Sequence, residues 1–373
     1  MKIGVPKEIV SGETRVASTP EMVKKLLAKG FEVCIERGAG HLACYDDAAY
    51  EAAEAQLVDT LDAFSADLVI KVRAPTLEEI GHFKQGAVFC ALLEPCENTA
   101  LLERLAEVGV TAFAMEAIPR TTRAQGMDVL SSQANIAGYR AVVEGAGRYV
   151  RFFPMMMTAA GAARPARVVV LGAGVAGLQA IATARRLGAE VEAFDVRPTV
   201  KEEIQSLGAK FIELDLGESG AGEGGYAREL TAEAKERQQK ALTEYLKKAN
   251  VIISTALIPC KAAPVLITEE AVKGLAEGSV IIDMAAANGG NCPLTKAGEV
   301  ITAHGVTIVG FTNYPALVPT DASAFYARNM LNLLSILVDT QDDALIFKDF
   351  SQDDITRAAM VTHQGKVLYQ PQT

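Results

Sequence analysis

The stretch RVVVLGAGVAGLQAIATARRLGAEVEAFDV, residues 167–196, decides the fold of this chain. It has the pattern of a strand, a glycine turn, an amphipathic helix and a second strand. The turn carries Gly172, Gly174 and Gly177 directly after an apolar run. In a dinucleotide-binding turn the first glycine permits a positive φ, the second lets a pyrophosphate approach the backbone, and the third allows close packing of helix on strand. The helix N-terminus then offers free N–H groups to the phosphates.

The acid at the end of the second strand indicates which dinucleotide binds. Asp195 stands where a carboxylate can accept hydrogen bonds from both ribose hydroxyls of adenosine and repel the 2′-phosphate of NADP. Arg197 points the other way, because a nearby arginine is what an NADP site uses. Since the acid occupies the strand-end position itself, we expect NAD(H).

The composition is that of a packed globular protein. The chain has 373 residues, of which 50% are hydrophobic and 22% charged, and its formal net charge is −10. This acidic balance, without a basic run, argues against a nucleic-acid partner. The six cysteines and four histidines form no CxxC, HExxH or paired-ligand spacing, so we expect no metal. No run reaches the roughly 18 apolar residues that a membrane-spanning helix requires.

Strand-like and helix-like blocks alternate along the chain, which is typical of βαβ units in mostly parallel sheets. We therefore expect an α/β fold with two Rossmann-like, doubly wound parallel-sheet domains and a cofactor cleft between them. The first domain is expected at residues 1–130 with a return at about 318–373. The NAD-binding domain is expected at 131–317, including a bridging helix at 131–152. A glycine-rich segment at 216–226 is either a plain insertion or a lid that carries Tyr226 over the cofactor.

Three blocks give the chain a resemblance to a known family. They are GVPKE (4–8) with ETRVA (13–17), the glycine turn, and PRTTRAQGMDVLSS (119–132). Together they resemble the NAD(H)-binding component of the proton-translocating nicotinamide nucleotide transhydrogenases, a family related to alanine dehydrogenase. The resemblance extends through ALIPCKAAPVLIT (256–268) and VIIDMAAANGGNCPL (280–294), so it covers nearly the whole chain.

The resemblance implies a role for each matching position. One group would orient the dihydronicotinamide and face NADP on a partner: Arg120, Gln125, Asp128 and Ser131. A second group would bind the rest of NAD(H): Gly172, Gly174, Val175, Ala176 and Gly177 at the pyrophosphate, Asp195, Val196 and Arg197 at the ribose, and Gly225, Tyr226, Gln238 and Leu257 at further contacts. Arginine and glutamine can donate to a carboxamide and Asp128 can accept from it, although without the resemblance these residues are more readily explained as a solvated linker.

The resemblance also implies an activity and its partners. The chain would pass hydride directly between NADH and NADP(H) held on a partner subunit, coupled to proton translocation. It would form a homodimer in the cytoplasm and lie on the inner membrane through a polytopic membrane subunit. Cys260 and Ala262 depart from the family pattern near Leu257.

Two other functions stay open. An NAD-dependent alanine-type dehydrogenase would use Lys71 and Arg15, but residues 89–94 lack the histidine that such an enzyme needs as an acid–base group. Asn288 also stands where that enzyme would place an acid. A non-catalytic NAD(H)-sensing module is the third possibility, against which the polar block at 120–131 argues.

Overall fold

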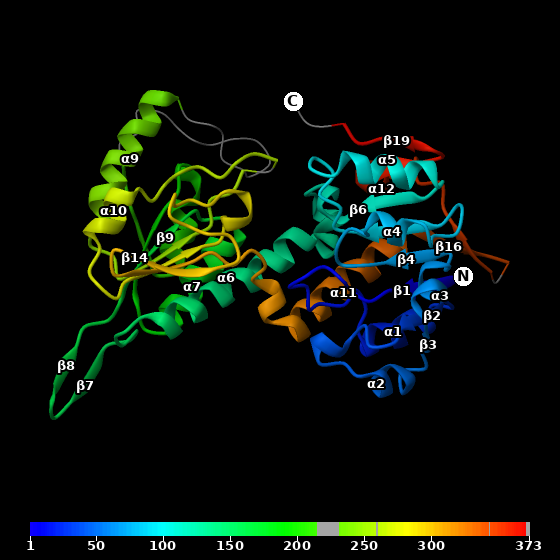
Figure 1. Cartoon of the computed structure of the whole chain (residues 1–373), viewed down its shortest axis with the longest axis horizontal. Helices are drawn as coiled ribbons and strands as arrows, with labels where there is room; N and C mark the ends of the chain where they lie inside the picture. Colours follow the sequence, from blue (N-terminus) through cyan, green and yellow to red (C-terminus); the bar gives the residue numbers. More distant parts are fainter. Residues whose placement is uncertain (215–230, 259, 343, 371–373) are drawn as a thin grey trace. The chain divides into compact units, whose positions relative to one another are not determined.

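A computed structural model describes residues 1–214, 231–258, 260–342 and 344–370. The chain divides into two compact units (Figure 1). The first unit comprises Met1–Gln133 and Pro315–Thr373, and the second comprises Ala134–Tyr314. Helix α6 (Val129–Arg148) begins in the first unit and continues in the second. Of the helices in the described part of the chain, none is both long and apolar enough to cross a membrane.

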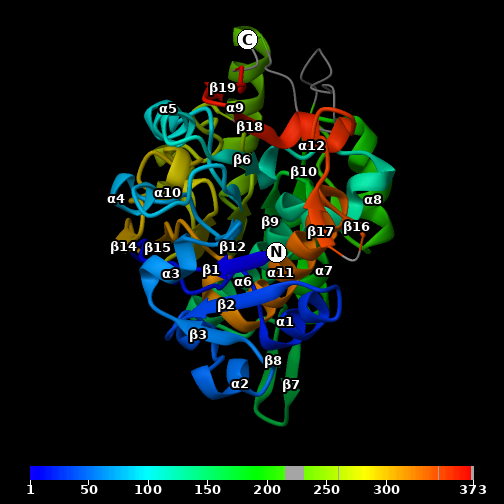
Figure 2. The same ribbon diagram turned by 90° about the vertical axis from the view of Figure 1, so that its right-hand side faces the viewer.

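The first unit contains an eight-stranded sheet among the described residues, in the order β19-β18-β6-β5-β4-β1-β2-β3 (Figures 1 and 2). The strands from β6 to β3 are parallel, and β18 joins β6 antiparallel. The strands are β1 (Lys2–Val5), β2 (Glu32–Glu36), β3 (Gln56–Val58), β4 (Leu68–Ile70), β5 (Val88–Ala91), β6 (Thr111–Ala114), β18 (Met360–His363) and β19 (Lys366–Val367). The C-terminal segment thus completes the sheet that the N-terminus begins.

The helices of the first unit are short, apart from α11. They are α1 (Pro20–Leu27), α2 (Asp47–Glu51), α3 (Thr60–Phe64), α4 (Leu77–Ile80), α5 (Thr99–Glu107), α11 (Pro319–Leu337) and α12 (Asp354–Ala359). The 3₁₀ turns are η1 (His41–Ala43), η2 (Met115–Ala117), η3 (Thr122–Met127) and η7 (Pro315–Leu317), and β16 (Val338–Gln341) pairs with β17 (Ala344–Phe347) in a hairpin. Thr19 caps α1 by accepting from the Met22 N–H, as the Thr19-Pro20 sequence predicts.

The second unit contains a seven-stranded sheet among the described residues, in the order β11-β10-β9-β12-β13-β15-β14. Of these described strands, only β14 runs antiparallel to its neighbour. The strands are β9 (Arg167–Leu171), β10 (Glu190–Phe194), β11 (Lys210–Phe211), β12 (Val251–Ser254), β13 (Val280–Asp283), β14 (Val300–Ala303) and β15 (Val306–Val309). The remaining elements are α7 (Val175–Arg186), α8 (Lys201–Ser206), α9 (Ala232–Leu246), α10 (Glu269–Gly274), η4 (Pro198–Val200), η6 (Ala286–Asn288) and the hairpin β7 (Met156–Thr158) with β8 (Gly161–Ala163).

The sheet of the second unit is covered on two faces. Along β9, Val168 and Val170 pack into one apolar cluster, and Val169 and Leu171 pack into another. Successive side chains of a strand point to opposite faces, so these two clusters are the two layers of core on either side of the sheet. The α/β, doubly wound fold predicted from the sequence is confirmed. Both sheets have the Rossmann strand order, since β3-β2-β1-β4-β5-β6 corresponds to β11-β10-β9-β12-β13-β15.

Helix α6 ends four residues before the predicted limit of the bridging helix at 152, and the hairpin β7–β8 follows it. Pro154 accounts for the difference, because proline cannot continue a helix interior. The apolar run that resembled a helix end therefore forms a two-stranded hairpin.

Candidate functional site

The glycine turn of the second unit lies where the strand order reverses. Strands β9 and β12 are neighbours, and the chain leaves β9 toward β10 on one side and β12 toward β13 on the other. Ligands of open α/β sheets bind outside the carboxyl ends of the strands at such a switch point. The Gly172 N–H donates to the Phe194 carbonyl at 2.8 Å, and the Thr255 N–H donates to the Leu171 carbonyl at 2.8 Å. These bonds hold three strand ends together around the turn.

The three glycines have three different structural roles. Gly172 has a φ of +92°, a conformation that residues with a Cβ rarely adopt. A Cβ on Gly177 would lie 1.9 Å from the Gly172 carbonyl oxygen, so this position needs glycine for α7 to approach β9. Gly174 has nothing within 4 Å of an added Cβ and its φ is an ordinary −77°. Packing therefore does not explain the glycine at 174, and the space beside it is open to a ligand.

The first turn of α7 has no side-chain cap. Gly174 is its N-cap residue and makes no capping hydrogen bond, whereas Thr231 caps α9 and Thr268 caps α10. The N–H groups of this turn thus lack the oxygen that other helices of the unit supply. Helix α6 supports the turn from behind, since a Cβ on Gly138 would lie 2.1 Å from the Ala176 carbonyl oxygen. An uncapped, rigidly held helix N-terminus beside open space is a suitable site for a phosphate.

Asp195 follows β10 and lies beside the glycine turn. It is 8% exposed, and its Oδ2 accepts from the Ala173 N–H at 2.8 Å. The Arg197 guanidinium also binds it, with Nε 2.9 Å from Oδ1 and Nη2 2.8 Å from Oδ2. The Arg197 N–H donates to Oδ1 at 2.8 Å. These hydrogen bonds to Asp195 raise the pKa of the Arg197 guanidinium. The carboxylate therefore lies beside the glycine turn, and Arg197 is its ion-pair partner.

A third group of polar residues shapes the loop that carries Leu257. The Asn291 side chain accepts from the Ser254 hydroxyl at 2.7 Å and donates to the Ala256 and Pro264 carbonyls at 2.9 and 2.8 Å. Asp283 accepts from the Asn291 N–H at 2.8 Å. We did not predict these roles for Ser254, Asp283 and Asn291. A polar residue that ends an otherwise apolar buried strand, as Ser254 and Asp283 do, is the signal that could have found two of them.

The predicted positions 120–131 lie in the first unit, on η3 and the start of α6. Asp128 accepts from the Ser131 N–H at 2.8 Å and from its hydroxyl at 2.6 Å, which caps α6. Arg120 and Gln125 are exposed. The structure thus brings Asp128 and Ser131 into contact.

Side chains from α11 and α12 hold this loop in place. Asn329 and Asn332 donate to the Gly126 carbonyl at 2.9 and 2.7 Å. Arg123 donates two hydrogen bonds to Asp353, at 2.6 and 2.7 Å. Because η3 is tied to the rest of the unit through its backbone and Arg123, the exposed Gln125 side chain projects from a fixed loop.

The other predicted positions lie apart from these groups. Val196 is half-buried, Leu257 is 47% exposed, and Gln238 lies buried on α9. Gly225 and Tyr226 lie outside the described residues. The described residues contain no cluster of three histidine, cysteine or acidic side chains that could hold a metal.

The switch point of the first unit is filled by its own charged side chains. Glu8 follows β1 and Lys71 follows β4, the two strands between which the order reverses. Lys71 is 0% exposed; its Nζ donates to Glu79 at 2.7 Å and lies 3.8 Å from Glu8 Oε2. The Val72 N–H donates to Glu8 Oε1 at 2.6 Å. Burial raises the pKa of Glu8 to about 7.

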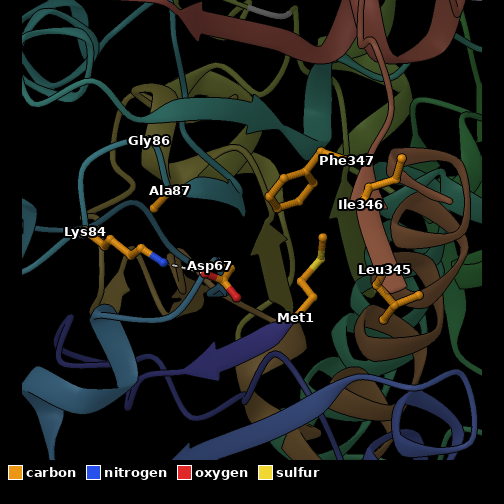
Figure 3. A pocket seen from close by; sticks show the side chains of 8 residues that line it. All are labelled: Met1, Asp67, Lys84, Gly86, Ala87, Leu345, Ile346 and Phe347. Carbon is orange, nitrogen blue, oxygen red and sulfur yellow. Dashed lines mark hydrogen bonds and ion pairs between the residues drawn. The ribbon is translucent and has the colours of Figure 1, made fainter. Parts of the chain in front are cut away.

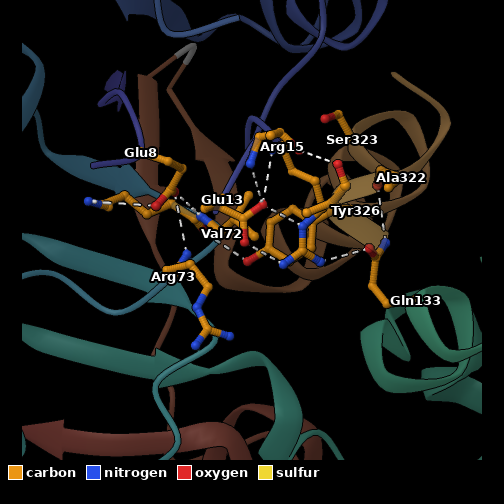
Figure 4. Close-up of polar contacts among 12 residues, drawn as sticks. Glu8, Glu13, Arg15, Val72, Arg73, Gln133, Ala322, Ser323 and Tyr326 are labelled. Carbon is orange, nitrogen blue, oxygen red and sulfur yellow. Dashed lines mark hydrogen bonds and ion pairs between the residues drawn. The ribbon is translucent and has the colours of Figure 1, made fainter. Parts of the chain in front are cut away.

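Arg15 belongs to the same buried region (Figure 4). It binds Glu13 through two hydrogen bonds of 2.8 and 2.7 Å and donates to Gln133 at 2.8 Å. The Tyr326 hydroxyl donates to the Lys71 carbonyl at 2.7 Å. The two cations that an amino-acid dehydrogenase would use, Arg15 and Lys71, are therefore engaged in buried ion pairs.

A surface pocket of the first unit lies away from these groups (Figure 3). Met1, Asp67 and Ala87 place it at the amino ends of β1, β4 and β5, and Leu345, Ile346 and Phe347 of β17 form its other wall. Lys84 binds Asp67 across it at 2.6 Å. Parallel sheets bind ligands at the opposite, carboxyl ends of their strands, so this pocket is not assigned to the site.

Comparison with known proteins places the chain in a family. The family named "Alanine dehydrogenase/PNT" matches with its N-terminal domain at residues 4–137 and its C-terminal domain at residues 141–370. An NAD(P) transhydrogenase subunit alpha chain of Rhodospirillum rubrum is 49% identical, over 99% of this chain and 98% of the relative. Alanine dehydrogenase 1 of Staphylococcus aureus is 32% identical, over 91% of this chain and 88% of the relative.

A solved structure agrees with the sequence comparison. The crystal structure of transhydrogenase from Sinorhizobium meliloti has a TM-score of 0.86 and 41% identity, covering 99% of each chain. The chain belongs to the alanine dehydrogenase/PNT family, as the three sequence blocks indicated.

Proposed function

We propose that this chain is the NAD(H)-binding alpha subunit of a proton-translocating NAD(P) transhydrogenase. Its relatives that carry the name NAD(P) transhydrogenase subunit alpha support this assignment. The observation that carries it is the glycine turn, where Gly174 leaves open space beside the uncapped first turn of α7. A dinucleotide fits this arrangement, because its pyrophosphate is the anion that such a turn receives.

The proposed contacts follow the dinucleotide from its centre outward. The N–H groups of Val175, Ala176 and Gly177 would receive the pyrophosphate. Asp195, with Val196 and Arg197, would bind the adenosine ribose. Further contacts would come from the loop with Leu257 that Asn291 holds, from Gln238, and from Gly225 and Tyr226.

The residues around η3 would position the nicotinamide for transfer. Hydride passes between the C4 atoms of the two nicotinamides, giving NAD⁺ and NADPH from NADH and NADP⁺, with no proton gained or lost. The site therefore needs no acid or base, and its catalysis rests on orientation and the exclusion of water. Gln125 and Arg120 can donate to the carboxamide oxygen. Each oxygen of Asp128 accepts one hydrogen bond from Ser131, which leaves acceptor capacity for the carboxamide NH₂.

Partners supply the other half of the reaction. NADP(H) would be held on a separate subunit, and a polytopic membrane subunit would couple hydride transfer to proton movement and place this chain on the cytoplasmic face of the inner membrane. The relatives from Rhodospirillum rubrum and Haemophilus influenzae are both named as the alpha subunit, which supports a complex of several chains.

A second copy of this chain is the proposed occupant of the β7–β8 hairpin. The described residues show no other strand paired with this hairpin. A two-stranded hairpin is marginally stable in water by itself. Met155, Met157 and the nearby Phe152 are 64%, 76% and 56% exposed, which is an unusual concentration of exposed large apolar side chains. A homodimer would cover them.

The alanine dehydrogenase relative favours a second candidate, oxidation of an amino acid by NAD. The buried ion pairs of Lys71 and Arg15 argue against it, because neither cation is available to a substrate carboxylate without breaking a pair. Residues 89–94 also lack a histidine. The transhydrogenase assignment is therefore preferred.

Two measurements test the assignment. Calorimetry of the full chain should give a clear binding signal with NADH and a much weaker one with NADPH. Mixed with an NADP(H)-binding subunit, NADPH and 3-acetylpyridine adenine dinucleotide, the chain should catalyse reduction of the NAD analogue. Formation of NADH from alanine and NAD⁺ by the purified chain alone would instead establish the dehydrogenase. A chain that binds NADH but supports neither reaction would be a sensor, and the assignment would be wrong.

A further inference from the structure

The ion pair between Asp195 and Arg197 has a consequence for coenzyme choice. A carboxylate offers about four lone-pair positions to donors. All four are used here, by the Ala173 N–H, the Arg197 N–H and two guanidinium N–H groups. Ribose hydroxyls can therefore reach Asp195 only by replacing hydrogen bonds that it already accepts.

The guanidinium is the group that can be replaced. The Ala173 and Arg197 N–H groups belong to the backbone of the turn and of the segment after β10, and moving them would disturb the sheet ends. The Arg197 side chain is 13% exposed and can rotate away. Glu203 is a further charge that acts on it, and the neighbouring Lys201 is already paired with Glu213. A released Arg197 would be a charged, planar double donor beside the ribose.

We propose that Arg197 is a masked receptor for a 2′-phosphate, and that its pairing with Asp195 is what makes the site select NAD(H) over NADP(H). The inference rests on the proposed function. Asp195 acts twice, by repelling the phosphate and by withholding the guanidinium that is placed to bind it. Planar guanidinium groups bind phosphate through two parallel hydrogen bonds, which is why this side chain, once freed, suits a 2′-phosphate.

The test compares the adenosine end of the two coenzymes alone. Calorimetry is carried out on the full chain with 5′-ADP and with 2′,5′-ADP. Asp195→Asn should bind 2′,5′-ADP roughly ten- to a hundredfold more tightly than the unchanged protein, and this gain should fall with added salt. The double variant Asp195→Asn/Arg197→Gln should lose the gain. Arg197→Gln alone should leave 2′,5′-ADP binding weak, because Asp195 still repels it.

A matched control lies on the same two strands. Arg167 of β9 binds Glu192 of β10 at 2.6 Å, so Glu192→Gln breaks a similar ion pair away from the turn. It should change neither affinity. If Asp195→Asn fails to fold, Asp195→Ala provides the same release of Arg197. In the unchanged protein, the NMR signal of the Arg197 Nε–H should shift when 5′-ADP is added.

The outcomes separate the two proposals. The inference is overturned if Asp195→Asn binds 5′-ADP but gains nothing for 2′,5′-ADP, or if the double variant keeps the gain. It is also overturned if the Arg197 signal stays still while 5′-ADP binds. A protein that binds neither 5′-ADP nor NADH overturns the proposed function itself.

Discussion

A pair of glycine-to-alanine substitutions separates folding from binding at the same turn. The added methyl group of Gly177→Ala would lie 1.9 Å from the Gly172 carbonyl oxygen and 2.8 Å from its carbon. Real Cβ atoms essentially never approach other heavy atoms within 3.0 Å, so α7 must move about 1 Å away from β9. The methyl group of Gly174→Ala meets nothing within 4 Å. The two variants carry the same chemical change in one turn, but one position is crowded by backbone and the other is open.

The expected magnitudes follow from this geometry. Overpacking against a rigid neighbour costs about 1–3 kcal/mol, and here the neighbour is backbone, which places Gly177→Ala near the upper end. The better helix propensity of alanine offsets about 1 kcal/mol. A net destabilisation of about 2 kcal/mol is expected. For Gly174→Ala, the poorer N-cap and the reduced entropy of the unfolded chain each amount to about 0.5–1 kcal/mol and oppose each other. Its stability should be unchanged.

Urea unfolding followed by circular dichroism measures the first effect, and calorimetry with NADH measures the second. Gly177→Ala should unfold at lower urea. Gly174→Ala should unfold like the unchanged protein but bind NADH at least about tenfold more weakly, because the methyl group occupies the pyrophosphate's place. Gly147→Ala is the control, since this exposed glycine of α6 also has nothing within 4 Å of an added Cβ.

Either of two results would refute the reasoning. Gly177→Ala as stable as Gly147→Ala would mean that α7 does not approach β9 closely. Gly174→Ala with unchanged NADH affinity would mean that the pyrophosphate lies elsewhere.

Three further predictions concern the first unit. Since burial raises the pKa of Glu8 from 4.5 to about 7, the folded chain holds an extra proton in that window, and its free energy of unfolding should fall by up to about 3 kcal/mol as pH rises through it. Urea unfolding at a series of pH values should show a flatter profile for Glu8→Gln; an unaltered profile would exclude Glu8 as the source. Gln125→Asn should slow hydride transfer in stopped-flow assays without changing NADH affinity or stability, since its side chain is exposed, and normal turnover would remove it from the site. Asp128→Ala should lower the free energy of unfolding by about 1 kcal/mol through loss of the α6 cap, and a urea midpoint equal to that of the unchanged protein would contradict the capping role.

The sequence predicted the elements that depend on local pattern. The run before Gly172 ends as strand β9 at Leu171, the helix and second strand follow, and Thr19 caps α1. The α/β organisation follows from alternating blocks of this kind. Such features can be predicted because strand and helix periodicity, capping and glycine turns involve residues only a few positions apart. The β7–β8 hairpin was missed because its short apolar run has no clear period.

Only the tertiary structure decided which polar groups meet. Two sheets have the same strand order, yet the switch point of one holds an open glycine turn while that of the other is filled by Glu8, Lys71 and Glu79. Asn329 reaches the Gly126 carbonyl from 203 positions away, and the Ala173 N–H completes the set of donors on Asp195. No periodicity encodes these contacts. They exist because chain folding brings distant donors and acceptors together in a buried region, where each must find a partner.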